Sequence, residues 1–95
     1  MFNTVEQVTF SNISATPATF TLRGGHYAIT AIATWGGGSV TLQRLAADAS
    51  TYVTVLTALT ANNFQTLNLP GGTYKLLVAT ATAIYVDITS VVTTM

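Results

Sequence analysis

The chain has 95 residues, of which 49% are hydrophobic and 6% are charged, and its formal net charge is zero. A chain of this length forms one domain with a single modest core, and its lack of positive charge argues against a nucleic-acid or anionic-membrane partner. It contains no cysteine, which excludes disulfides, thiolate zinc sites and cysteine nucleophiles. Threonine occurs 19 times, and because this β-branched residue suits a half-exposed pleated surface, the composition favours strands.

The first half of the chain alternates apolar and polar residues in four segments, which polar or glycine-rich turns separate. This period of two is typical of strands with one buried face. The longest segment runs from His26 to Trp35 and places Tyr27, Ile29 and Ala31 on one face. A polar turn is expected at 11–17, and Gly36-Gly37-Gly38 predicts a tight reversal. The first predicted strand ends at Phe10, and the next three cover residues 19–22, 26–35 and 40–46.

The second half predicts four more strands. Asp48 begins a polar turn, since its carboxylate can accept hydrogen bonds from backbone N–H groups two residues further on. Residues 57–63 are expected to form a loop. No segment has the i, i+3, i+4, i+7 spacing of an amphipathic helix over a useful length. The four predicted strands cover residues 52–56, 64–69, 73–79 and 82–92, so the total is eight.

A glycine-rich turn recurs in the sequence at an interval of 47 residues. Around Gly71-Gly72, the segment Leu67–Leu69 leads into the turn and the strand with Tyr74 leads out of it. Around Gly24-Gly25 the same order holds, from Leu22 to Tyr27. Two such strand–turn–strand halves predict an all-β domain, a single small antiparallel β-sandwich or jelly roll of about eight strands. A chance similarity between two Gly-Gly hairpins is the alternative.

The residues capable of catalysis do not converge in the predicted strands and turns. His26 follows a Gly-Gly pair at a strand start and lacks a GxSxG partner, so an exposed or capping histidine is expected. Asp48 is explained as a turn residue and Asp87 as a solvated or interface carboxylate. One histidine and no Asp-rich loop predict no metal, and Gly36–Gly38 lacks the features of a phosphate loop. We therefore expect a protein that is not an enzyme and binds no cofactor.

Three aromatic residues suggest a binding surface. Trp35 is in phase with Tyr27 and Ile29, so we expect it to pack in the core or at the sheet edge. Tyr52 and Tyr85 alternate outward and are candidates for stacking on sugars or for a protein interface. Carbohydrate binding is therefore one function that these residues suggest.

Four turn-and-core motifs carry a resemblance to a known group of proteins. They are Gly24-Gly25-x-Tyr27, Gly37-Gly38-x-Val40-x-Leu42-x-Arg44, Asp48–Tyr52 and Leu69-Pro70-Gly71-x-x-Tyr74. The chain from Leu22 to Thr89 resembles small β-sandwich virion proteins of tailed bacteriophages and prophages, similar to capsid decoration (cement) proteins. Ala49 departs from the Asp-Gly or Gly-Ser turn expected there.

The resemblance implies a structural protein that binds the outside of a phage capsid and stabilises it. The alternative is a carbohydrate-binding or tail-fibre accessory module for host recognition. Its partners would be the major capsid protein, other copies of itself in a dimer or trimer, or both. The neutral composition agrees, because uncharged strand edges favour association. We expect residues 1–7 to form an N-terminal arm and 91–95 a C-terminal tail. The expected interface residues are Phe2, Val5, Arg44, Tyr52, Tyr85 and Val92.

The expected location is the capsid surface. The first ten residues have no basic segment followed by an apolar run, so the protein is expected to be made in the host cytoplasm without a signal peptide. The long uncharged stretch from residue 49 to 74 is interrupted by Thr, Asn, Gln, Pro and Gly, which predicts no transmembrane helix.

Overall fold

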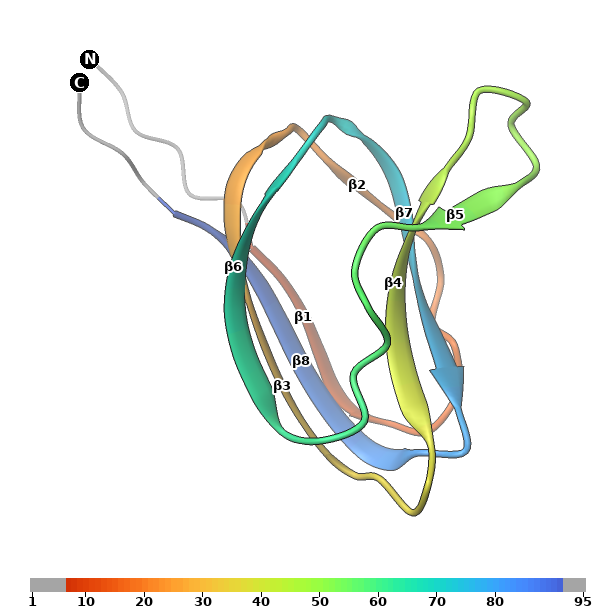
Figure 1. Cartoon of the computed structure of the whole chain (residues 1–95), viewed down its shortest axis with the longest axis vertical. Coiled ribbons are helices and arrows are strands. Elements are labelled where there is room, and N and C mark those ends of the chain that lie inside the picture. The colour runs from red at the N-terminus through yellow and green to blue at the C-terminus, as the bar shows by residue number, and fades with distance from the viewer. Residues whose placement is uncertain (1–6, 92–95) are drawn as a thin grey trace.

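A computed structural model describes residues 7–91 of the chain, which form two four-stranded antiparallel sheets packed face to face (Figure 1). The predicted all-β sandwich of eight strands is confirmed. The strands are β1 (Gln7–Ile13), β2 (Phe20–Leu22), β3 (Gly25–Thr34), β4 (Ser39–Leu45), β5 (Tyr52–Thr54), β6 (Asn63–Leu69), β7 (Gly72–Ala79) and β8 (Thr82–Ser90).

The strand order is that of a jelly roll. One sheet has the order β1-β8-β3-β6 and is called sheet A here; the other has the order β2-β7-β4-β5 and is called sheet B. Each strand of the first half pairs with its counterpart in the second half, from Gln7 with Thr89 at one end to Leu45 with Tyr52 at the other. The chain is thus one long antiparallel ribbon, closed at the β4–β5 hairpin and rolled into two sheets.

The core lies between the sheets and confirms the predicted strand phases. In β3, Tyr27, Ile29 and Ala31 point inward and are fully buried. In β7, Tyr74 and Leu76 do the same. Aromatic rings join the two sheets, with the Phe10 ring 5.5 Å from the Phe20 ring and the Phe20 ring 6.3 Å from that of Tyr74. The other buried apolar residues are Leu22, Val40, Leu42, Leu59, Leu69, Ala81, Ile84, Val86 and Ile88.

The sequence suggested that the glycine-rich turns close hairpins within a sheet. In the structure they instead carry the chain from one sheet to the other. The Gly24-Gly25 turn passes from β2 in sheet B to β3 in sheet A, and the Pro70–Gly72 turn returns from β6 to β7 beside it. Only β4 and β5 are both consecutive in sequence and paired. Alternation indicates which side chains face inward but does not select a neighbouring strand, which explains the difference.

The 47-residue repeat corresponds to a real structural equivalence. Leu22 pairs with Gly72, and Gly25 pairs with Leu69. Adding 47 to the first residue of each pair gives the second residue of the other pair, so the two turns are related by a local two-fold axis. The turns touch, since a Cβ on Gly24 would lie 2.7 Å from the Gly71 nitrogen. We call this contact the Gly24/Gly71 corner.

A second corner of the ribbon lies where β3 passes to β4 alongside the passage from β7 to β8. Gly36 and Gly37 have φ values of 51° and 81°, and the Gly38 N–H donates to the Trp35 carbonyl at 2.6 Å, so the predicted tight turn is present. Gly38 is buried, and a Cβ there would overlap the backbone of Ala79 and Ala81. We call this contact the Gly38/Ala79 corner.

Several predicted boundaries were wrong, and one residue of an expected loop is buried. Strand β1 continues through the expected polar turn to Ile13, with an irregular register after Phe10 where Asn12 has a φ of 53°. Strand β5 ends at Thr54 instead of residue 56. The expected loop at 57–63 contains Leu59, which is 6% exposed and pairs with Val40 through reciprocal backbone hydrogen bonds.

Candidate functional site

Three of the six exposed large hydrophobic side chains among the described residues lie on the solvent side of sheet A. Ile32 on β3, Phe64 on β6 and Tyr85 on β8 are 46%, 66% and 45% exposed. The strand phase places all three on this side, because Ile32 pairs with Tyr85 and Phe64 pairs with Thr30. We call this surface the Tyr85 face. Because these apolar side chains share one face, the Tyr85 face is the candidate functional site.

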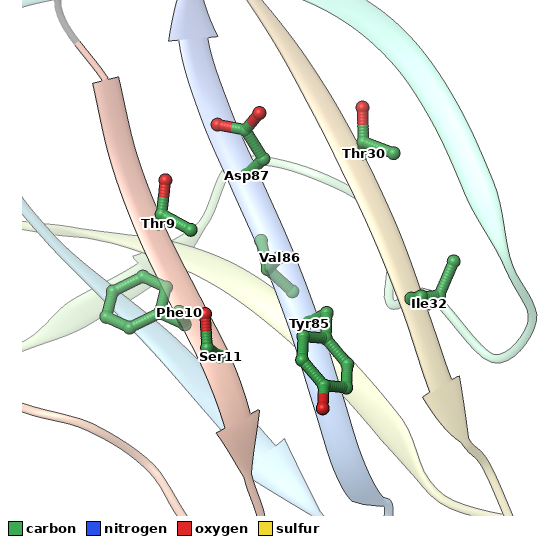
Figure 2. A pocket seen from close by; sticks show the side chains of 8 residues that line it. All are labelled: Thr9, Phe10, Ser11, Thr30, Ile32, Tyr85, Val86 and Asp87. Carbon is green, nitrogen blue, oxygen red and sulfur yellow. The ribbon is translucent and has the colours of Figure 1, made fainter.

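A shallow hollow of about 210 Å³ lies over β1, β8 and β3, beside Ile32 and Tyr85 of the Tyr85 face. Figure 2 shows the Tyr85 ring beside Ile32, and above them a row of Thr9, Asp87 and Thr30 that crosses three strands. The arrangement follows from the register, since Asp87 pairs with Thr9 on one side and with Thr30 on the other. The hollow therefore combines an apolar wall with a polar rim. Its remaining lining residues are Phe10, Ser11 and Val86.

The polar rim retains unused hydrogen-bonding groups. Asp87 Oδ1 accepts from Thr89 Oγ1 at 2.7 Å and from Gln7 Nε2 at 3.1 Å, whereas Oδ2 has no hydrogen-bond partner within the described chain. The hydroxyls of Thr9, Ser11 and Thr30 likewise make no hydrogen bond to the described residues. A ligand placed against Tyr85 thus meets one carboxylate oxygen and three hydroxyls that make no hydrogen bond within residues 7–91.

Tyr52, the other exposed tyrosine of the sequence prediction, lies on the opposite side of the sandwich. It belongs to β5 of sheet B, and Lys75 Nζ lies 4.3 Å from the centre of its ring. A cation–π contact of this kind occupies the ring face. The structure therefore does not bring Tyr52 and Tyr85 into one site.

Arg44 contacts its own chain at the Gly24/Gly71 corner. Its Nη2 donates to the Gly71 carbonyl at 2.7 Å, and its guanidinium covers Gly72, where a Cβ would lie 2.9 Å from Nη2. Arg44 Nε is buried and has no hydrogen-bond partner among the residues that the structure describes. Burial raises the pKa of the neighbouring Tyr74, an effect that the charge of Arg44 partly opposes. These contacts give Arg44 a structural role, and its predicted place at an interface stays a prediction.

The other predicted interface residues, Phe2, Val5 and Val92, lie outside the described residues. Two adjoining positions are described. Gln7, assigned to the N-terminal arm, is the first residue of β1, and the Val91 N–H, assigned to the tail, donates to the His26 carbonyl at 2.7 Å.

The reactive side chains remain dispersed. His26 Nδ1 lies 2.7 Å from Asn68 Oδ1. Asp48 accepts hydrogen bonds from the Ser50 N–H, the Thr51 N–H and the Thr51 hydroxyl, as its predicted turn role requires. The Thr51 hydroxyl bond, followed by the two backbone bonds, lowers the pKa of Asp48 to about 2. Residues 7–91 contain no group of three or more metal-ligating side chains, and none of their segments is a helix able to cross a membrane.

Trp35 follows the sequence prediction, whereas two residues of the Tyr85 face were missed. Trp35 is partly buried against the core, and its Nε1 donates to Asn62 Oδ1 at 2.9 Å, which confirms the predicted packing role. The sequence prediction missed Ile32 and Phe64 as members of an exposed face. The alternation of β3 could have identified Ile32, because this large apolar residue falls on the opposite side of the strand from Tyr27 and Ile29.

No family model, curated protein or solved structure matches this chain.

Proposed function

We propose that this protein is a structural virion protein that docks through the Tyr85 face onto the outside of a phage capsid and stabilises it. The observation that carries the proposal is the exposure of Ile32, Phe64 and Tyr85 together on one face of sheet A. Burying these side chains against a coat subunit removes apolar area from water, which favours attachment without opposite charges on the two partners.

The composition and the fold support the same function. Asp87 is the only Asp, Glu, Lys or Arg residue that the described strands place on the Tyr85 face, so docking requires little desolvation of charge. Jelly rolls occur in viral capsid proteins as well as in lectins, although a fold does not by itself specify a function. The resemblance to decoration proteins selects the capsid among these. We propose no reaction and no cofactor for this protein.

Attachment to phage heads that lack this protein tests the proposal. We expect wild-type protein to bind such heads and Tyr85→Ala to bind about tenfold or more weakly, the loss typical of a central aromatic contact. Ile32→Ser should also weaken attachment. Leu77→Ser is the matched control, because Leu77 is 38% exposed on the outer side of sheet B. Equal binding by all three variants, or no binding by the wild type, would contradict the proposal.

Glycan binding is the second candidate, and the rim of the hollow favours it. A pyranose ring stacked on Tyr85 would place its hydroxyls near Asp87 Oδ2 and the free hydroxyls of Thr9 and Thr30. Such a module would serve host recognition from a capsid or a tail fibre.

A glycan array separates the two candidates. If the hollow binds sugars, Asp87→Asn should weaken glycan binding because it removes a charged acceptor, while attachment to heads should change little. Binding of wild-type protein to heads but to no glycan would leave only the capsid function.

A further inference from the structure

We propose that the free edge of β6 is a self-association site, at which β6 of a second copy of this chain adds antiparallel about a two-fold axis through Thr66. The two copies of sheet A would then form one continuous eight-stranded sheet. This inference goes beyond docking to a capsid and does not rest on it, because it follows from the four strand edges of the sandwich.

Three of the four edges are protected against strand addition. In sheet B, the edge strands β2 and β5 have three residues each, which is too short to template a stable new strand. In sheet A, β1 is interrupted after Phe10 by the irregular register at Asn12. A bulge of this kind bends an edge strand and interrupts its row of backbone groups.

Strand β6 has none of these protections. It pairs with β3 in an unbroken register over all seven residues, from Asn63 to Leu69. Its sequence NFQTLNL contains no charged residue, proline or glycine. On the side away from β3, its backbone N–H and C=O groups make no hydrogen bond to any described segment. A long, regular, uncharged edge with free backbone groups is a ready template for another strand.

The sequence of β6 favours a second copy of itself as the occupant. With Thr66 opposite Thr66 of the second copy, Phe64 lies opposite Asn68 on the outer side, and no charge faces another. Thr–Thr pairs across antiparallel strands are favourable, and Phe64, now 66% exposed, gains a cross-strand neighbour. The two-fold axis makes the Phe64–Asn68 contact twice and the Thr66–Thr66 contact once, on the axis itself, as in an isologous interface. The zero net charge of the chain adds no repulsion between copies.

Sedimentation of the full chain tests the inference. We expect wild-type protein to form a dimer and Thr66→Lys to be a monomer, because the substitution places two lysines opposite each other across the axis. Thr21→Lys is the matched control, since Thr21 is exposed on β2, the edge strand of sheet B. It should leave the dimer intact. Circular dichroism and thermal melting establish that both variants fold.

Hydrogen exchange locates the interface. In the wild-type dimer, the β6 backbone amides that point away from β3 should exchange more slowly than in the Thr66→Lys monomer. The amides of β2 should exchange equally in both. A monomeric wild type would overturn the inference, as would a dimer that survives Thr66→Lys or is disrupted by Thr21→Lys. Binding to phage heads is measured separately through Tyr85→Ala, so failure of one proposal is distinguishable from failure of the other.

Discussion

The two glycine corners bring two crossing backbone segments into contact in different ways. At both, two antiparallel segments cross together from one sheet to the other with their backbones in contact. At the Gly24/Gly71 corner each segment contributes a glycine, and the pairing is symmetric about a local two-fold axis. At the Gly38/Ala79 corner the glycines are all on one segment, and the other segment carries Ala79, Thr80 and the buried Ala81.

The difference shows where the fold tolerates a side chain. Glycines on both segments leave each backbone some room to shift, and exposed Gly71 can move toward solvent. A single buried glycine against two residues with side chains leaves no such room. The first corner is instead secured by side chains, since Tyr27, Tyr74 and Arg44 all bond to its backbone.

Gly38→Ala should have the largest effect on stability. A Cβ at residue 38 would overlap the Ala79 carbonyl oxygen and the Ala81 nitrogen, which are backbone atoms that cannot move alone. We expect a loss of about 3 kcal/mol or more in the free energy of unfolding, measured by urea denaturation. Gly37→Ala is the control, because its φ is 81° but its Cβ would meet no atom within 4 Å. It should cost only about 1 kcal/mol, and equal losses would show that the close contact is unimportant.

Gly24→Ala should cost less, at about 2 kcal/mol. The new Cβ would lie 2.7 Å from the Gly71 nitrogen, and the residue would keep a φ of 97°. Gly25→Ala separates the two causes, since Gly25 has a φ of 136° and open space around it. A loss for Gly24→Ala as large as that for Gly38→Ala would remove the proposed difference between the corners.

Tyr74→Phe tests the side chains that secure the first corner. The Tyr74 hydroxyl donates to the Pro70 carbonyl from a buried position, so its removal should cost about 1 kcal/mol in urea denaturation. The raised pKa of Tyr74 also predicts that stability falls as pH rises above about 10, because the unfolded state then releases its proton more readily. In Tyr74→Phe, the part of the fall in stability at alkaline pH that Tyr74 causes should be absent. Tyr85→Phe, which changes an exposed hydroxyl, should do neither.

The smallest effect is expected at the β4–β5 hairpin, which lies outside both corners. The pKa of Asp48 is about 2 in the folded protein and 3.8 ordinarily, so its carboxylate stabilises the fold above about pH 4 and loses that contribution as the pH falls toward 2. Asp48→Asn should flatten the acid limb of a stability–pH curve and leave both corners intact. An unchanged acid limb would contradict this role.

Ala49, in the turn after Asp48, adopts a left-handed backbone conformation. Ala49 has a φ of 63°, a conformation that glycine adopts without strain. The departure noted in the sequence at this position therefore coincides with a strained residue.

Much of the fold was predictable because it depends on local alternation. The inward phase of Tyr27, Ile29 and Leu76 follows from the period of two, and the Asp48 turn follows from side-chain hydrogen bonding to nearby N–H groups. The core role of Leu59 was not predictable, since an isolated leucine among polar residues has no period. The Tyr85 face was half predictable, because Tyr85 alternates outward but its proximity to Ile32 depends on the pairing of β8 with β3.

The sequence by itself determined that this chain makes eight strands around one core, with neutral surfaces and turns at its glycines. Those properties depend on neighbours one to four residues apart, where side-chain chemistry acts directly. The tertiary structure alone decided that the glycine turns cross between sheets, that Tyr52 and Tyr85 face opposite ways and that β6 is an open edge. Each of these depends on which distant strands pair, and pairing is chosen by the packing of the whole core.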